Sequence, residues 1–351
     1  MTLPSLALAF ALGPATQAAP QPSRKFDAAA YTSPAFEGSG AQLREALRVH
    51  GTTRRVRRLG FSAPRVDRNC HTQAIAIARG HVLMSCVDRR NGVGWLQIFG
   101  REGDGARPSR RGRSVRLHDV DRPHPAVGQA VVGHGRQRGE LLVPIGNESL
   151  DVHGTTSSRL ELRDGSGTLV CAIDNPRPGG LAATALVTTQ GSVHAIAVSY
   201  AELLVWRVDG VQPGTDVCDA ELVFAAAGTD VAGDKWRRYQ GIAALVARDR
   251  DVFLFAGRRH HLDAWKLSDF GESHMRVEAV GSMQWRPAAM PVRGIFHEGL
   301  GVEPHAGGLR IWAAPRDFRR GSCLPASADE RCTPAVYYVD QPLAQPVLTS
   351  R

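Results

Sequence analysis

No segment of this sequence contains the ~20 consecutive apolar residues that a membrane-spanning helix needs, so we expect no transmembrane segment. A Gly-x-Ser-x-Gly elbow and a phosphate-cradling glycine loop are both missing, which argues against an elbow-type serine hydrolase and a nucleotide-binding loop. There is also no Cys-x-x-Cys pair and no zinc-finger spacing of Cys and His. We therefore assign no metal site, and the sequence leaves any cofactor unknown.

Lysine and aromatic residues are scarce. The formal net charge of +9 comes from arginine, since lysine occurs only at positions 25, 235 and 266. Arginines form two clusters, at Arg54, Arg55, Arg57 and Arg58 and at Arg107, Arg110, Arg111, Arg113 and Arg116. Such clusters can meet polyanions, but the interleaved aromatics that stack on bases are missing. We favour solvated outer strands, and nucleic acid is not expected as a partner.

The N-terminal residues have the pattern of an export signal. Residues 1–18 hold the apolar run Leu6 to Leu12 and end in the small residues of a cleavage site. A buried helix is the alternative, because no Lys or Arg precedes the run. We expect a signal peptide over 1–18, a flexible lead and a short helix over 19–53, and a secreted or periplasmic protein. Ser39 and Gln42 predict the start of that helix, which we expect to plug one end of the fold.

Six cysteines fit an oxidising compartment, where an even number indicates disulfides. Cys323 and Cys332 lie nine positions apart in a proline-containing loop and are the easiest pair to bridge. Cys70 and Cys86 fall toward the same end of two neighbouring predicted strands. Cys171 and Cys218 pair by elimination.

A weak internal repeat is the strongest signal for the fold. Similar segments begin near Gln73, Gln129, Ala183, Gln240 and Glu298, at spacings of 56, 54, 57 and 58 residues. Each unit reads as four short strands, and no long helical periodicity separates them, which excludes an α/β fold. The last unit is one strand short. We predict that residues 55–61 supply that strand, because pairing the open sheet edge closes the ring.

These units predict an all-β fold: a single five-bladed β-propeller over residues 54–351, closed by an N-terminal strand. Over residues 55–341 the pattern resembles the architecture shared by tachylectin-like lectins and by furanosidase and sucrase-type glycosidases. The resemblance to such glycosidases implies two separated carboxylates, but the innermost strands offer only Glu298 and Glu303, both in the last unit. A lectin implies a sugar-stacking aromatic in every unit. Here the tryptophans fall inside predicted strands and are typical of core: Trp95, Trp206, Trp265 and Trp312.

In a propeller, the loops before each innermost strand and between its second and third strands open on one face. These loops carry a polar group that we take as the candidate site. Glu298, His297, His71 and His124 are the candidate catalytic residues, because imidazoles ligate metals or anions and a carboxylate can act as a general base. The candidate ligand-binding residues are Gln73, Gln129, Tyr239, Gln240, Asp88 and Arg316. Ordinary solvation at a channel mouth is the alternative interpretation.

The sequence therefore favours an exported β-propeller that acts as a ligand-binding or interaction module with a polar central site. The expected partner at the channel mouth is a small or anionic ligand, or another protein. The alternative is a secreted hydrolase of glycosides, esters or phosphates, with or without a metal, so whether the protein is an enzyme stays open at this point.

Overall fold

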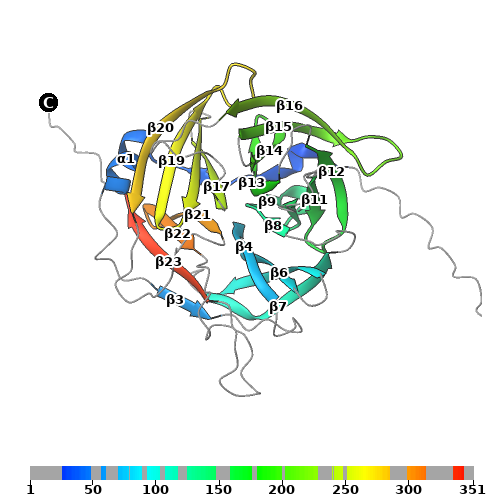
Figure 1. Ribbon diagram of the computed structural model, residues 1–351, viewed down its shortest axis with the longest axis horizontal. Coiled ribbons are helices and arrows are strands. Elements are labelled where there is room, and N and C mark those ends of the chain that lie inside the picture. The colour runs from blue at the N-terminus through cyan, green and yellow to red at the C-terminus, as the bar shows by residue number, and fades with distance from the viewer. Residues whose placement is uncertain are drawn as a thin grey trace, which may run out of the picture.

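The computed structural model describes residues 26–48, 57–60, 70–78, 80–88, 93–102, 107–117, 125–147, 159–175, 180–199, 202–227, 239, 241–247, 251–284, 299–313 and 335–343. They form five β-sheets arranged as a ring around one axis (Figure 1). The predicted five-bladed β-propeller is thus confirmed.

Three blades are each built on a four-stranded antiparallel meander numbered outward from the axis, and blade four carries one further short strand, which is described below. Blade one consists of β4 (Cys70–Ala78), β5 (His81–Asp88), β6 (Val93–Glu102) and β7 (Arg107–Leu117). Blade three consists of β13 (Leu181–Thr189), β14 (Ser192–Ser199), β15 (Glu202–Val211) and β16 (Cys218–Ala227). Blade four consists of β17 (Gly241–Ala247), β18 (Val252–Arg258), β19 (His261–Ser268) and β20 (Arg276–Gln284).

Blade two has a split inner strand. β8 (Pro125–Val127) and β9 (Val131–Gly133) both pair with β10 (Leu141–Asn147), and a 3-10 turn, η2 (Gly135–Gln137), leads from β9 toward β10. β11 (Arg159–Asp164) and β12 (Leu169–Asp174) complete the sheet. The interruption falls at Gly128, where an added Cβ would lie 2.0 Å from the carbonyl oxygen of Thr184 in blade three. Only glycine lets the two inner strands approach this closely.

Blade five is completed by a strand from the other end of the chain, as the sequence predicts. β21 (Leu300–His305), β22 (Gly308–Ala313) and β23 (Ala335–Pro342) are followed in space by β3 (Arg57–Gly60). β3 pairs antiparallel with β23, with Arg58 opposite Tyr337. Without this partner the outer edge of β23 would be an open row of peptide groups.

The hydrophobic core is divided into five clusters, each formed mainly by the facing sides of two neighbouring blades. Trp206, Trp265 and Trp312 are buried within these clusters, as expected from their places inside strands, while Trp95 is half-buried. A four-membered stack joins blades five and one. The guanidinium of Arg101 lies over Trp312, whose ring contacts Tyr338, and the guanidinium of Arg310 lies over that tyrosine. Each cation–π contact adds stability at the seam.

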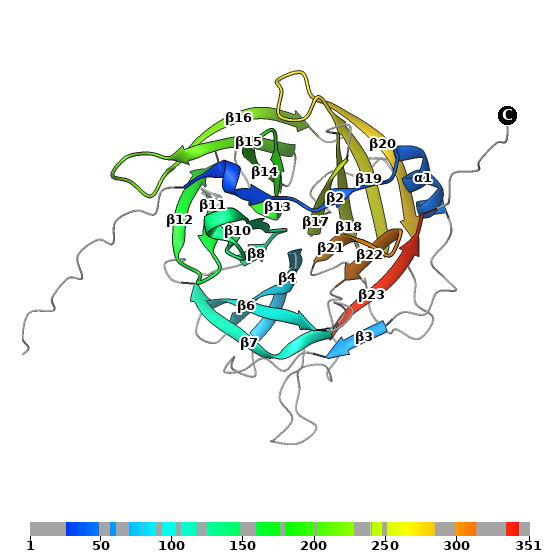
Figure 2. The same cartoon turned by 180° about the vertical axis from the view of Figure 1, so that it is seen from behind.

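An N-terminal strap crosses one face of the ring. β1 (Tyr31–Thr32) pairs with β9 in blade two, and β2 (Ala35–Phe36) pairs parallel with β17 in blade four. Between them, Ser33 exchanges hydrogen bonds with Thr188 at the end of β13. Figure 2 shows this segment lying across the ring. The composition of residues 31–36 predicts a flexible lead, but in the structure the strap pairs with peptide groups at the ends of three inner strands.

The helix α1 (Gly40–Arg48) begins where the sequence predicts, but it does not lie at the predicted position at one end of the ring. The Ser39 N–H donates to Gln42 Oε1 at 2.9 Å and the Gln42 N–H to Ser39 Oγ at 3.3 Å, which is a capping box. The helix does not plug the ring. It packs on β20 at the outer side of blade four, because Leu43 and Leu47 join the core cluster shared by blades four and five. The strap, not the helix, covers the ring face.

Candidate functional site

We call the face at which the inner strands begin the entry face, and the opposite face, covered by the strap, the base. The candidate site is expected at the entry face. His71 and Gln73 lie on β4 and Asp88 lies at the end of β5, with Cys70 opposite Asp88 in the strand register. Glu298, His297, His124, Gln240 and Arg316 lie outside the described residues.

Two blades meet β4 at the same level. From blade two, the carbonyl of Pro125 accepts a hydrogen bond from the buried Ser85 hydroxyl at 2.6 Å, and Ser85 is the register partner of Ala74 on β4. From blade five, Gly299 lies so close to β4 that an added Cβ would be 2.3 Å from the Ile75 nitrogen. The entry-side ends of β8 and β21 therefore flank β4 just below Gln73.

The inner strands of blades four and five also approach each other closely at this level. Gly241 on β17 lies against the start of β21, with an added Cβ 2.5 Å from the Leu300 nitrogen. Contacts of this kind between inner strands leave no room for side chains larger than glycine at the crossing points. A ligand at the entry face would therefore lie above the inner strands rather than pass between them.

Gln129 is a buried link between blades. Its side-chain Nε2 donates to the Ala244 carbonyl at 2.6 Å, and its Oε1 accepts from the Ala244 N–H at 2.9 Å. The amide thus acts like a further peptide group beside the free edge of β17. Gln129 is also paired through its backbone with Ala185 in blade three. These bonds use one donor and one acceptor of the side chain, and ligand contact by Gln129 stays a prediction.

Tyr239 is likewise buried, at the approach to β17. Its hydroxyl donates to Asp263 Oδ2 at 3.0 Å, and the Arg258 Nε donates to the same oxygen at 3.1 Å. Its ring meets Trp265 edge to face, with 5.4 Å between the ring centroids. Asp263 and Arg258 are not among the predicted site residues, although an aspartate inside an otherwise apolar strand is a usable sign of a buried polar cluster. Tyr239 is held firmly here, and its contact with a ligand stays a prediction.

Glu303 belongs to the base. It lies near the end of β21, where Oε2 accepts from Arg101 Nη1 at 2.6 Å and Oε1 accepts from Trp312 Nε1 at 3.0 Å. The side chain is only 13% exposed. Because both oxygens are engaged and the charge is compensated by Arg101, Glu303 serves the seam between blades five and one.

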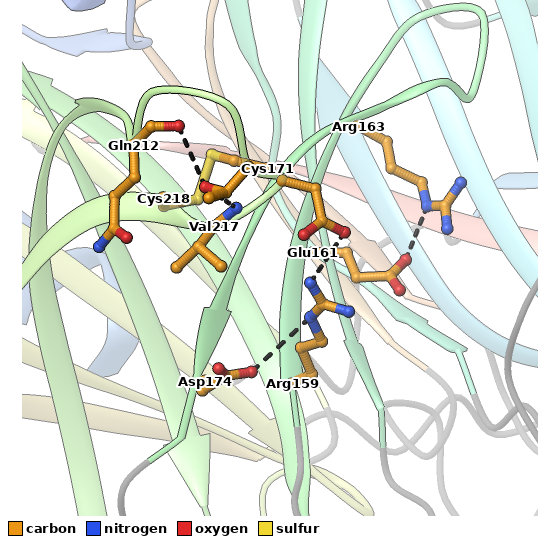
Figure 3. A network of polar contacts seen from close by, with 10 residues as sticks. Arg159, Glu161, Arg163, Cys171, Asp174, Gln212, Val217 and Cys218 are labelled. Atoms are coloured by element: carbon orange, nitrogen blue, oxygen red, sulfur yellow. Dashed lines mark hydrogen bonds and ion pairs between the residues drawn. A yellow bond between two sulfur atoms is a disulfide. The ribbon is translucent and has the colours of Figure 1, made fainter. Parts of the chain in front are cut away.

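A second polar network closes the outer seam between blades two and three (Figure 3). Cys171 on β12 and Cys218 on β16 form a disulfide, which confirms the pair assigned by elimination. Arg159 forms ion pairs with Asp174 and Asp216, at 3.7 and 3.2 Å. The network is charge-paired internally, so it acts as a structural clasp.

The other predicted disulfides are only partly visible. Cys86 is disulfide-bonded, and the strand register places Cys70 two residues from its level. The structure does not describe the side chain of Cys70, so the Cys70–Cys86 disulfide stays a prediction. Cys323 and Cys332 both lie outside the described residues.

His194 is a buried histidine of blade three, far along the chain from the predicted catalytic residues. Burial first, and then the charge of Arg207, lower its pKa to about 4. Its Nδ1 lies 3.3 Å from the Thr189 hydroxyl, and its ring meets Phe270 edge to face. The imidazole is therefore neutral at physiological pH and serves packing between blades three and four.

Within the part of the chain that the structure describes, no three His, Cys, Asp or Glu side chains gather as a metal site. No helix among the described residues is long and apolar enough to cross a membrane.

No protein-family model matches the sequence, and no curated protein matches it. Among solved structures, the chain is similar to an α-L-arabinofuranosidase from Podospora anserina in complex with cellotriose, at 10% identity and a TM-score of 0.51, covering 84% of this chain and 99% of that one. The likeness is one of fold. The catalytic domain of an α-L-arabinofuranosidase from Coprinopsis cinerea matches at 10% identity and a TM-score of 0.49, covering 83% and 98% of the two chains. A glutaminyl cyclase from Myxococcus xanthus matches at 15% identity and a TM-score of 0.41, covering 82% and 96%.

Proposed function

We propose that the protein is an exported β-propeller that binds a small polar or anionic ligand at the entry face, in a site centred on β4. The observation that carries this proposal is the meeting of three blades at one level of β4. Pro125 reaches that level from blade two through Ser85, and Gly299 reaches it from blade five against Ile75.

Chain connectivity extends this observation to the predicted site residues. His124 immediately precedes Pro125, and Glu298 immediately precedes Gly299. Pro125 and Gly299 are the described neighbours of these two residues in the chain, and both lie beside blade one at the level of Ala74 and Ile75 on β4. We therefore propose that these two residues, with His71 and Gln73 on β4 and with His297, form the centre of the site.

The chemistry of this group suits a ligand with both acceptor and donor groups. Neutral imidazoles and an amide can each donate and accept hydrogen bonds, and the carboxylate accepts them. Asp88, Gln240 and Arg316 are proposed as further contacts, with Arg316 available to an anionic group. The Cys171–Cys218 disulfide supports export, because such bonds persist in oxidising compartments.

A secreted hydrolase is the second candidate, favoured by the fold likeness to an α-L-arabinofuranosidase. Fold alone does not carry activity. A glycosidase of the two-carboxylate type needs an acid and a base or nucleophile around the bond that breaks. On the inner strands that the structure describes, the single carboxylate is Glu303, which is already paired at the base. In this proposal Glu298 would be the general base, and the histidines would polarise the substrate or hold a metal.

One set of variants separates the two candidates. The triple variant His71→Ala, His124→Ala, His297→Ala and the single variant Glu298→Gln are compared with His134→Ala, an exposed histidine on the base side. Elemental analysis and turnover of p-nitrophenyl glycosides, esters and phosphates are measured, together with binding of arabino-oligosaccharides and inorganic phosphate. Turnover lost in E298Q, or a stoichiometric metal lost in the triple variant, favours the hydrolase.

Binding without metal or turnover, abolished by the triple variant and kept by H134A, favours the binding module. If every variant behaves as the wild type in all of these measurements, the entry-face site is refuted.

A further inference from the structure

A pocket of about 410 Å³ lies at the base of the ring axis, beneath residues 32–35 of the strap. Its walls come from three blades: Ala78 at the end of β4 in blade one, Ala130 just before β9 in blade two and Val302 on β21 in blade five. β4 begins at the entry face and ends at Ala78, so this base pocket lies at the opposite end of the axis from the proposed site. Its volume falls within the range of small-molecule sites.

The walls of the base pocket are aliphatic. Ile77, Ala78, Ala130 and Val302 are buried and Val132 is half-buried. Water held against such a surface finds few hydrogen-bond partners, whereas a hydrocarbon group loses unfavourable contact with water there. The body of a ligand for this pocket is therefore apolar.

The strap supplies hydroxyl groups whose bonds are already made inside the protein. The Thr32 hydroxyl donates to the Val132 carbonyl at 3.3 Å. The Ser33 oxygen accepts from the Thr188 N–H at 2.6 Å and from the Thr188 hydroxyl at 3.2 Å, which fills its two lone pairs. These bonds hold the strap in place and use both acceptor positions of the Ser33 hydroxyl.

Among the lining residues that the structure describes, Glu303 is the one that carries a charge. Each of its oxygens accepts one hydrogen bond, from Arg101 or from Trp312, and a carboxylate oxygen has two acceptor positions. One acceptor position therefore remains on each oxygen, and a single donor from a ligand can use either of them. A cationic ligand would compete with Arg101 for a charge that is already compensated, and an anionic ligand would be repelled by the carboxylate.

We propose that the base pocket binds a compact, uncharged molecule with a hydrocarbon body and one hydroxyl group, which donates a hydrogen bond to Glu303. This site is independent of the ligand site proposed at the entry face. The strap makes it a pocket, because residues 32–35 form the wall that the three blades do not provide.

The test uses benzyl alcohol as the probe, with toluene, benzylammonium and benzoate as comparators, in ligand-observed NMR titrations of the full chain. For a ligand of this size we expect a dissociation constant on the order of 1 mM for benzyl alcohol. Toluene is expected to bind roughly tenfold more weakly because it lacks the donor. The two charged probes are expected not to bind.

Two variants test the location. Ala130→Leu fills the pocket and should abolish binding, while Val132→Thr keeps the wall shape, makes it polar and should weaken binding about fivefold. Ala225→Leu, at an exposed position of β16, is the matched control and should bind as the wild type does. His71→Ala at the entry face should also leave binding unchanged.

Circular dichroism checks that each variant is folded. If A130L does not fold, V132T alone tests the location of the site. The proposal is overturned if benzyl alcohol does not bind the wild type, if toluene or a charged probe binds as tightly, or if neither pocket variant weakens binding. Loss of binding in H71A would place the probe at the entry face and would equally overturn it.

Discussion

Replacing Gln129 by alanine should destabilise the ring without acting on a ligand directly. The substitution removes the two hydrogen bonds that the side-chain amide makes with the Ala244 N–H and carbonyl. Ala244 is fully buried, so both of its peptide groups lose their partner where water cannot replace it. Each such group costs about 1–3 kcal/mol. We therefore expect the free energy of unfolding to fall by roughly 4 kcal/mol in total.

Urea unfolding followed by far-ultraviolet circular dichroism measures this loss as a lower midpoint with an unchanged slope. In a thermal scan the same loss corresponds to a decrease in Tm of about 6 °C. Gln212→Ala is the matched control, because the Gln212 side chain is exposed and its backbone N–H still donates to the Val217 carbonyl. It should unfold as the wild type does.

The opposite result would refute this reasoning. If Gln129→Ala unfolds at the urea concentration of the wild type but loses affinity for the entry-face ligand, Gln129 contacts the ligand, as the sequence predicts, and its bonds to Ala244 contribute little. Gln129→Glu adds a second measurement. It keeps the acceptor for the Ala244 N–H but sets a buried carboxylate oxygen against the Ala244 carbonyl oxygen, so it should lose at least as much stability as Gln129→Ala.

Three further predictions concern the seams between blades. The unfolded chain protonates His194 near its ordinary pKa of 6.5 and the folded chain only near 4, so the unfolded state holds more protons between these values. The free energy of unfolding should therefore fall by up to ~3 kcal/mol as the pH drops through that window. Urea unfolding at about pH 7 and about pH 4.5 measures this fall. An equally steep fall in His194→Asn would contradict its assignment to His194. Arg101→Met should lower the free energy of unfolding by about 3–5 kcal/mol, because it leaves Glu303 with an uncompensated charge. Adding Glu303→Gln should restore part of the lost stability. A double variant no more stable than Arg101→Met would show that the charge is not the cause. Replacing both Cys171 and Cys218 by alanine opens a link across a sequence separation of 47 and should cost about 4 kcal/mol in chemical unfolding, whereas an unchanged midpoint would show that the seam holds without it.

The ring and its closure could be predicted from sequence because both leave a periodic signal. Near-equal spacing of similar segments marks the blades, and a missing strand in the last unit points to a strand from elsewhere. The closing strand β3 was found in this way. The strap left no such signal, because β1 and β2 are two residues long and Pro34 separates them. Elements this short show no alternation to detect.

The candidate site was only partly predictable. Polar residues before the inner strands can be listed from the sequence, but their partners come from other blades. Arg101 and Glu303 are 202 positions apart, and Gln129 reaches Ala244 across 115. No local pattern in the sequence links such pairs, so the sequence alone does not indicate that Glu303 is bonded to Arg101 and Trp312. The bond between Asp263 and Tyr239 likewise joins residues that no local pattern links.

The pairing of β3 with β23 has a consequence for biosynthesis. A ribosome makes the closing strand before the strands of blades one to four and its partner after them, so Arg57–Gly60 has no sheet to join until Ala335–Pro342 has emerged. Until then the outer edge of β22 is uncovered, and a nascent chain with an unpaired edge is prone to associate with its neighbours. We expect truncation before Ala335 to give aggregated protein rather than a smaller stable ring.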